Sequence, residues 1–242
     1  MKNIISFIVL ICSVAVILTS CSKDETDDDS TAIGAAGSGS TATGTVSGMD
    51  GLTGTFNMSS SGAEPSGGCI SGTLVAAMIA LSALPSDTLG YKSQIIISSS
   101  TTYTISMQYY SDASCATITG YMNVGYKNFL VVGSLSGLSG SSPTKPTTAK
   151  KVSWNDDFTA LKSNTDSTTT WFNSVFGASS LSTLGFAQGT ELKVTNDPDT
   201  NVSIWETGTL SGSSKTYLFT ERDSASTYPD NWTSNASVWW QE

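Results

Sequence analysis

Strict alternation of apolar and polar side chains from residue 102 to residue 110 limits what this chain can fold into more than any other feature. The apolar positions of this run are Tyr103, Ile105, Met107 and Tyr109. A similar run follows Cys115, with Ile118 and Met122 on its apolar side. Successive side chains of a strand point to opposite faces of a sheet, so each run predicts a strand with one buried face. Residues 111–114, Ser-Asp-Ala-Ser, are turn-forming, so the two strands are predicted to form a hairpin.

The rest of the chain after residue 50 repeats this pattern in shorter runs. Further strands are predicted at residues 52–58, 94–98, 128–135, 151–154, 190–195, 202–206, 216–220 and 237–240. Short strands separated by turns are typical of an antiparallel β-barrel or β-sandwich. Residues 73–84 are apolar nearly all round and favour a buried helix, and residues 167–184 carry aromatic side chains at helical spacing. We therefore expect a mainly β domain over residues 50–242 with one or two short helices.

The first twenty residues have the features of a lipoprotein signal peptide. Lys2 precedes an apolar run from Ile4 to Leu18, which is shorter than the roughly 20 residues that a membrane-spanning helix needs. The run ends in Leu18-Thr19-Ser20-Cys21, which resembles the lipobox, where a leucine and small residues precede the cysteine that is acylated. We predict a signal peptide at residues 1–20 and a lipid-bearing Cys21. The alternative is an ordinary secretory leader that ends near a cysteine.

Residues 21–49 are predicted to be a lipidated, flexible tether. Five acidic residues lie between positions 24 and 29, and Ser, Thr, Gly and Ala dominate the rest. A tether of this length has a root-mean-square reach of roughly 30 Å. Ser22 favours transport to the outer membrane, and Lys23 followed by acidic residues resembles a surface-export signal of some Gram-negative lipoproteins. We expect a lipid-anchored outer-membrane protein, on the cell surface rather than facing the periplasm; a plain solvated spacer is the alternative.

Charge and composition exclude several classes of function. The chain carries a net charge of −9, which argues against a nucleic-acid partner because phosphates require basic surfaces. It contains no histidine, so Ser-His-Asp and Cys-His catalysis are excluded, although Ser-Lys and carboxylate-pair catalysis are not. Asp156 and Asp157 are poor acid–base partners, since neighbours on a strand point to opposite faces. We expect no enzymatic activity and no cofactor.

Two cysteines remain in the mature domain once Cys12 leaves with the signal peptide and Cys21 carries the lipid. They are Cys69 and Cys115, 46 residues apart. In an oxidising envelope an isolated pair predicts one disulfide, which contributes about 4 kcal/mol in the chain-entropy model. A reactive or metal-binding thiol pair is the alternative, but the chain has neither a histidine nor a third mature cysteine to complete such a site.

Several motifs resemble the lipocalin-like domains of bacterial outer-membrane lipoproteins. Gly54-Thr55-Phe56 is similar to their opening Gly-x-Trp strand, with Phe in place of Trp, and Cys69 follows shortly. Residues 109–115, Tyr-Tyr-Ser-Asp-Ala-Ser-Cys, are similar to a strand-ending tyrosine, acidic turn and second cysteine. Tyr228-Pro229 precedes a last aromatic strand at residues 238–240. The resemblance covers residues 50–240 and implies an antiparallel lipocalin-like barrel of about eight strands whose interior is able to hold a small apolar ligand.

The interior of such a barrel supplies the candidate ligand site. The positions predicted to point inward are Phe56, Met58, Tyr103, Ile105, Met107, Tyr109, Ile118 and Met122. These side chains either line a pocket for a hydrophobic small molecule or fill a packed core.

Two further features are candidate binding sites. The six tryptophans are Trp154, Trp171, Trp205, Trp232, Trp239 and Trp240. Exposed tryptophans would stack on sugars, whereas buried ones anchor a core. Residues 196–201 place oxygen atoms at alternate positions suited to Ca²⁺, but they lack the glycine and distal glutamate of an EF-hand, so a plain turn without metal is favoured.

Together these features predict a non-enzymatic, membrane-anchored lipoprotein whose barrel binds a hydrophobic small molecule. One alternative is a surface interaction module that binds glycan or protein. Another is an accessory envelope lipoprotein with no ligand. An open cavity would favour the first function, a row of exposed tryptophans the second, and a filled barrel without an aromatic platform the third.

Overall fold

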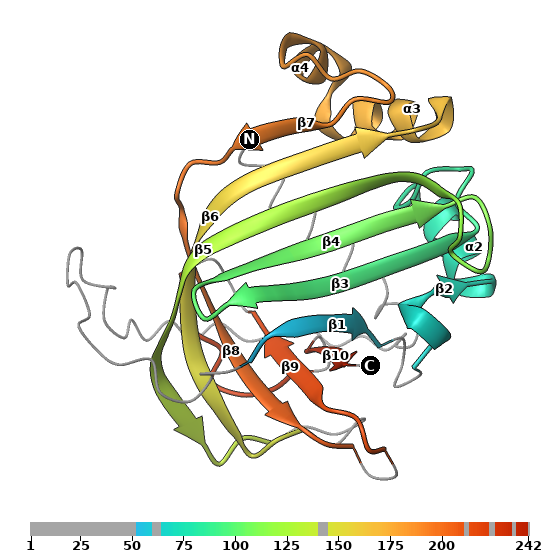
Figure 1. The fold of residues 1–242 in the computed structure, drawn as a ribbon. Coiled ribbons are helices and arrows are strands. Elements are labelled where there is room, and N and C mark those ends of the chain that lie inside the picture. The colour runs from blue at the N-terminus through green and yellow to red at the C-terminus, as the bar shows by residue number, and fades with distance from the viewer. Residues whose placement is uncertain are drawn as a thin grey trace, which may run out of the picture.

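The computed structural model describes residues 52–59, 64–139, 145–210, 213–222, 226–233 and 236–241. The predicted signal peptide, Cys21 and the predicted tether lie outside these residues. The described elements are β1 (Gly54–Met58), η1 (Ser66–Gly68), β2 (Ile70–Ser71), α2 (Thr73–Ala80), β3 (Gly90–Ser99), β4 (Thr102–Tyr110), β5 (Ile118–Ser136), β6 (Thr148–Ser163), α3 (Asp166–Phe176), α4 (Ala178–Thr183), β7 (Leu192–Thr195), β8 (Thr200–Gly208), β9 (Tyr217–Glu221) and β10 (Ser237–Gln241) (Figure 1). None of these helices is both long and apolar enough to cross a membrane.

Eight strands close into an antiparallel barrel. They are hydrogen-bonded in the order β1-β10-β9-β8-β6-β5-β4-β3, and β1 pairs with β3 to complete the ring. β2 adds to the end of β3, and β7 pairs with the second half of β6. The structure therefore confirms the predicted mainly β, antiparallel barrel. Closure leaves each of the eight strands paired on both sides, which removes the exposed edges that promote aggregation.

The predicted hairpin is present as β4 and β5, but a β-bulge at its start changes one inward position. Tyr109 pairs with Gly120, whereas Tyr110 pairs with Ile118, so one extra residue of β5 lies between these pairs. An extra residue reverses the face to which the preceding side chain points. Ile118 is accordingly 38% exposed rather than buried in the barrel, and its prediction as an inward residue was wrong.

β5 and β6 are longer than the sequence pattern indicated, and the strand predicted at residues 128–135 is not separate but the second half of β5. They pair along most of their length, with register shifts at Gly125/Tyr126, Lys127/Leu130 and Val131/Gly133. Bulges of this kind bend a strand and increase its twist, which lets two long strands curve around the barrel. Glycine is required at position 125, because a Cβ there would lie 2.1 Å from the Phe158 ring.

The barrel interior is a packed hydrophobic core. Its side chains that are 3% exposed or less include Phe56, Tyr103, Met107, Tyr109, Met122 and Trp239. Met58 is also buried, and Ile105 is only partly buried but packs against the same cluster. All eight barrel strands contribute side chains to this cluster, including Leu218 of β9.

Helices close one end of the barrel. Trp171 and Phe172 of α3 pack against Tyr109 at the end of β4, with ring centroids 5.3 Å and 6.1 Å away. Figure 1 shows α2 and α3 at this same end of β4. The Trp171 indole N–H donates to the Ser82 carbonyl at 3.0 Å, which ties α3 to the segment after α2. The predicted helix at residues 73–84 ends earlier, at Ala80, and buries one side rather than its whole surface.

A second hydrophobic cluster lies on the outer face of β8, β9 and β10. Its buried members include Ile204, Tyr217, Phe219, Val238 and Trp240, covered by Leu138, Trp232 and Ala236 from the connecting segments. The Trp232 indole N–H donates to the Pro146 carbonyl at 2.7 Å. This side of the barrel is therefore covered by its own connections.

Candidate functional site

The structure brings most of the predicted inward residues together, and it fills the space between them. Phe56, Met107, Tyr109 and Met122 have no exposed surface, and they belong to one continuous cluster. Protein interiors packed in this way have few voids larger than a water molecule. The deep interior is therefore a core, and a binding site has to be sought at an end of the barrel.

A small pocket lies at the end of the barrel opposite the helices. Its lining residues are Leu52, Ile97, Ser99, Ser100, Thr102, Tyr103, Phe129 and Trp205. Tyr103 and Tyr109 lie near opposite ends of β4, about 20 Å apart along the strand. The pocket has room for about one water molecule. Its floor is apolar and aromatic, and its rim carries three hydroxyl groups.

Aromatic rings form the floor of this pocket and continue beneath it. Tyr103 lies at the centre, with ring centroids 4.6 Å from Tyr126, 5.7 Å from Phe129 and 5.1 Å from Trp205. The angles between the ring planes range from stacked to edge-on, which is the arrangement that aromatic quadrupoles favour. Burial, and secondly the neighbouring Tyr126, raise the pKa of Tyr103 well above its usual value, so its hydroxyl stays neutral.

Three polar side chains, linked by hydrogen bonds, lie in the barrel wall beside these rings, and we call them the relay. The Asn201 side-chain amide donates to Asp156 Oδ1 at 2.9 Å, and its carbonyl accepts from Arg222 Nη2 at 2.5 Å. Asp156 is 2% exposed and Asn201 is 1% exposed. Burial raises the pKa of Asp156, while the Asn201 hydrogen bond and the Arg222 charge oppose that shift. The relay joins β6, β8 and the end of β9.

Sequence reasoning missed this relay. It considered Asp156 only beside Asp157, and correctly expected the two to point apart: Asp157 instead forms an ion pair with Lys127 at 2.8 Å. The partners of Asp156 come from other strands, 45 and 66 residues later in the chain. The sequence did carry one signal. Val152 and Trp154 are apolar and lie on one side of the strand, and Asp156, the next position on that side, is charged.

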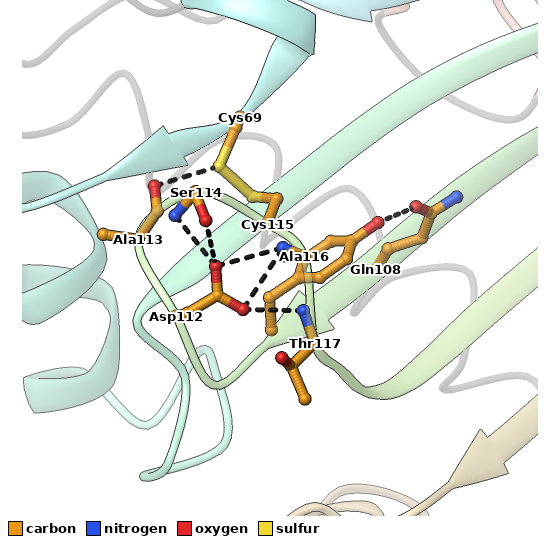
Figure 2. Close-up of a disulfide and its surroundings, with 9 residues drawn as sticks. Cys69, Gln108, Asp112, Ala113, Ser114, Cys115, Ala116 and Thr117 are labelled. Atoms are coloured by element: carbon orange, nitrogen blue, oxygen red, sulfur yellow. Dashed lines mark hydrogen bonds between the residues drawn. A yellow bond between two sulfur atoms is a disulfide. The ribbon is translucent and has the colours of Figure 1, made fainter.

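The predicted disulfide is present between Cys69 and Cys115, with 5.9 Å between their Cα atoms (Figure 2). It joins the segment before β2 to the turn between β4 and β5. Within that turn, the Asp112 carboxylate accepts hydrogen bonds from the backbone N–H groups of Ser114, Ala116 and Thr117. The Ser114 hydroxyl, then these backbone donors, hold the pKa of Asp112 well below its usual value. The disulfide and the hydrogen-bonded turn therefore hold these two segments together near the end of the barrel that the helices close.

The other two predicted sites do not form binding surfaces. All six tryptophans are buried, with Trp171 the most exposed at 7%, so no tryptophan platform is available for sugars. In the 196–201 loop, the Asn196 amide bonds to the Thr159 hydroxyl and Asn201 belongs to the relay. Within the described part of the chain, no group of three or more acidic, cysteine or histidine side chains is placed to hold a metal ion.

Comparison with known proteins does not assign a family. A scan against protein-family models found no match, and no curated protein matches the chain. The functional conclusion therefore rests on the geometry of the pocket.

Proposed function

We propose that this chain is a lipid-anchored envelope lipoprotein whose lipocalin-like barrel binds a small hydrophobic molecule at the end opposite the helices. The observation that carries the proposal is the pocket between Leu52, Ile97, Tyr103, Phe129 and Trp205. An apolar, aromatic floor with a few polar groups at the rim is the usual composition of a small-molecule site. The proposed site is confined to this pocket, which we call the mouth of the barrel, because the deeper interior is filled with side chains.

The position of the pocket supports an apolar ligand drawn from the membrane. Leu52 lines the pocket and directly precedes β1, so the predicted tether joins the barrel at this same end. A lipid on Cys21 and a tether reach of roughly 30 Å would keep the mouth close to the bilayer. Ligand transfer between bilayer and barrel would then need only a short path.

The size of the pocket limits what binds without rearrangement. It accommodates about one water molecule, so an acyl chain or fused ring system has to displace side chains at the mouth. Phe129 is the natural candidate for movement. It follows Asn128, whose left-handed φ of 55° marks a break in the regular strand. At the rim, the Ser99 and Thr102 hydroxyls hydrogen-bond each other at 2.7 Å, and the exposed Ser100 hydroxyl is the one that would bind a polar end of the ligand.

The test places a bulky side chain at the exposed rim of the pocket so that it fills the opening. We expect the purified full-length chain to bind N-phenylnaphthylamine, a neutral hydrophobic fluorophore, with increased emission. Ser100→Trp should weaken this binding at least tenfold, because Ser100 is an exposed rim residue and its replacement fills the opening. The matched control is Ser180→Trp, since Ser180 is also exposed and lies in α4, outside the pocket lining.

The outcomes separate the candidate functions. Selective weakening by Ser100→Trp supports ligand binding at the mouth, and competition with envelope lipid extracts then identifies the natural ligand class. Equal behaviour of the two variants would place the fluorophore elsewhere and overturn the proposed site. If the wild-type chain binds no fluorophore at all, the accessory role without a ligand replaces the proposal.

A further inference from the structure

A separate feature is the polar outer face of the sheet formed by β3 to β7. Strand register places Lys92, Gln108, Tyr121 and Lys162 in one row across β3, β4, β5 and β6. The next row runs from Asn57 through Gln94, Ser106, Asn123 and Ala160 to Lys193. These side chains alternate with the buried interior set, so they point away from the core. Asn57, Ser106 and Ala160 are only 3% exposed, so the accessible members of the two rows are Lys92, Gln94, Gln108, Tyr121, Asn123, Lys162 and Lys193. We call these two rows the polar face.

Hydrogen bonds fix the amide side chains of the polar face. The Gln94 amide donates to Asn57 Oδ1 at 2.8 Å, and the Gln108 amide donates to Gln94 Oε1 at 3.3 Å. The Tyr110 hydroxyl donates to the Gln108 side-chain carbonyl. Because these amides are already ordered, little side-chain entropy is lost when they bind a partner.

The lysines of the polar face are also held in place. Lys92 Nζ lies 5.8 Å from the centroid of the Tyr110 ring, and Lys193 Nζ lies 3.9 Å from that of Phe158. Phe158 in turn lies against Gly125. The aromatic rings attract the two ammonium groups; Lys193 is exposed to solvent and Lys92 is partly exposed.

The charge of the polar face is opposite in sign to that of the whole chain. The chain as a whole has a net charge of −9. Of the nearby carboxylates, Asp157 forms an ion pair with Lys127, whereas Glu191 accepts a hydrogen bond from the neutral Tyr121 hydroxyl and keeps its charge beside the face. Lys92, Lys162 and Lys193 outnumber Glu191, so this face carries an excess of positive charge, which attracts anions to one side of an acidic protein.

From this placement we infer that the polar face binds an acidic polysaccharide. The remaining donors and acceptors of the ordered Gln94 and Gln108 amides hydrogen-bond sugar hydroxyls, and the lysines bind carboxylate or sulfate groups. Neighbouring strands are about 4.8 Å apart, so Lys92 and Lys162, three strands apart, are separated by about 14 Å. That span suits several sugar units of a polymer rather than a monosaccharide. This inference uses a different surface from the mouth pocket and does not depend on it.

Affinity electrophoresis of the purified full-length chain in gels containing polygalacturonate or neutral dextran tests the inference. We expect retardation by polygalacturonate that weakens with salt, and no retardation by dextran. The triple variant Lys92→Gln, Lys162→Gln, Lys193→Gln should lose affinity at least tenfold. The charge-matched control is Lys150→Gln, Lys151→Gln, Lys215→Gln, because these lysines lie off the polar face.

Each outcome decides the inference. Loss in the face variant alone supports it, provided that circular dichroism and the absence of free thiols show both variants folded. Similar losses in both variants would mean that overall charge, not this face, controls binding. Equal retardation by dextran would overturn the acidic class of ligand, and no retardation by either polymer would overturn glycan binding. The Ser100→Trp variant should bind polygalacturonate normally, which keeps the two proposed sites separable.

Discussion

Replacing Asn201 with alanine should destabilise the barrel more than any other single change to a polar side chain in the relay. Asn201 is 1% exposed and bridges Asp156 at 2.9 Å and Arg222 at 2.5 Å. Alanine removes both hydrogen bonds and leaves a carboxylate that is 2% exposed without its amide donor. Hydrogen bonds to charged groups contribute about 1.5–3 kcal/mol each, and an unsatisfied buried partner adds to the cost.

We therefore expect Asn201→Ala to lower the free energy of unfolding by about 3 kcal/mol. For a domain of this size the Tm should fall by about 10 °C. Urea unfolding followed by circular dichroism measures the change directly. Asn155→Ala is the control, because Asn155 lies on the same barrel wall but its hydrogen bonds to Pro198 and Thr200 are exposed. A loss below about 1 kcal/mol in Asn201→Ala, or an equal loss in the control, would refute the buried-relay argument.

The same relay predicts the sign of a pH dependence. The pKa of Asp156 is raised above 3.8, mainly by burial, so the folded state favours the protonated carboxyl. The destabilising effect of its charge is absent below pH 3.8 and develops as the pH rises through the raised pKa. Asp156→Asn keeps the acceptor for Asn201 and cannot ionise. Its stability relative to wild type should therefore increase from about pH 3 to pH 7, and a decrease over that range would show that Arg222 outweighs burial.

Two further predictions concern the cysteines. The double variant Cys69→Ser, Cys115→Ser should lower the free energy of unfolding by about 4 kcal/mol, because the 46-residue loop is no longer closed. Urea unfolding of the wild-type protein in reductant should give the same value as the variant. Unchanged stability in both would contradict the structural role of the disulfide. Cys21→Ala should abolish incorporation of labelled palmitate into the chain in growing cells, and surface location predicts that proteinase K digests the wild-type protein on intact cells. Persistent labelling of the variant would exclude Cys21 as the lipid site.

Local alternation predicted most of the strands, because the signal for a half-buried strand lies within the strand itself. The run at residues 102–110 became β4, and the short runs near residues 94, 202, 216 and 237 all correspond to strands. The helical spacing at residues 167–184 likewise corresponds to α3 and α4. The disulfide was also predictable, since elimination left only one pair of cysteines. These features depend on sequence spacing and composition, not on which distant segments meet.

Features that depend on distant partners were not predictable. The second half of β6 was missed because Asp156, Asp157 and Lys162 interrupt its apolar pattern, and the groups that satisfy Asp156 come from β8 and the end of β9. Ile118 was misplaced because a bulge, which follows from pairing geometry, reverses its face. The tryptophans gave no sign of their environment, and the cover over β8 to β10 that buries Trp232 and Trp240 became visible only in three dimensions.

The two proposed sites differ in what limits their affinity, and this difference makes them separable by salt alone. At the mouth, a ligand larger than a water molecule has to move packed aromatic side chains, so the cost of moving them offsets part of the free energy from burying the ligand's apolar surface. On the polar face, the amides are already ordered by hydrogen bonds and the lysines by aromatic rings, so charge attraction sets the affinity. Raising the ionic strength from about 0.01 M to 1 M shortens the Debye length from about 30 Å to 3 Å. Polysaccharide binding should therefore collapse over this range while fluorophore binding at the mouth holds or strengthens, and parallel salt responses would show that one surface accounts for both.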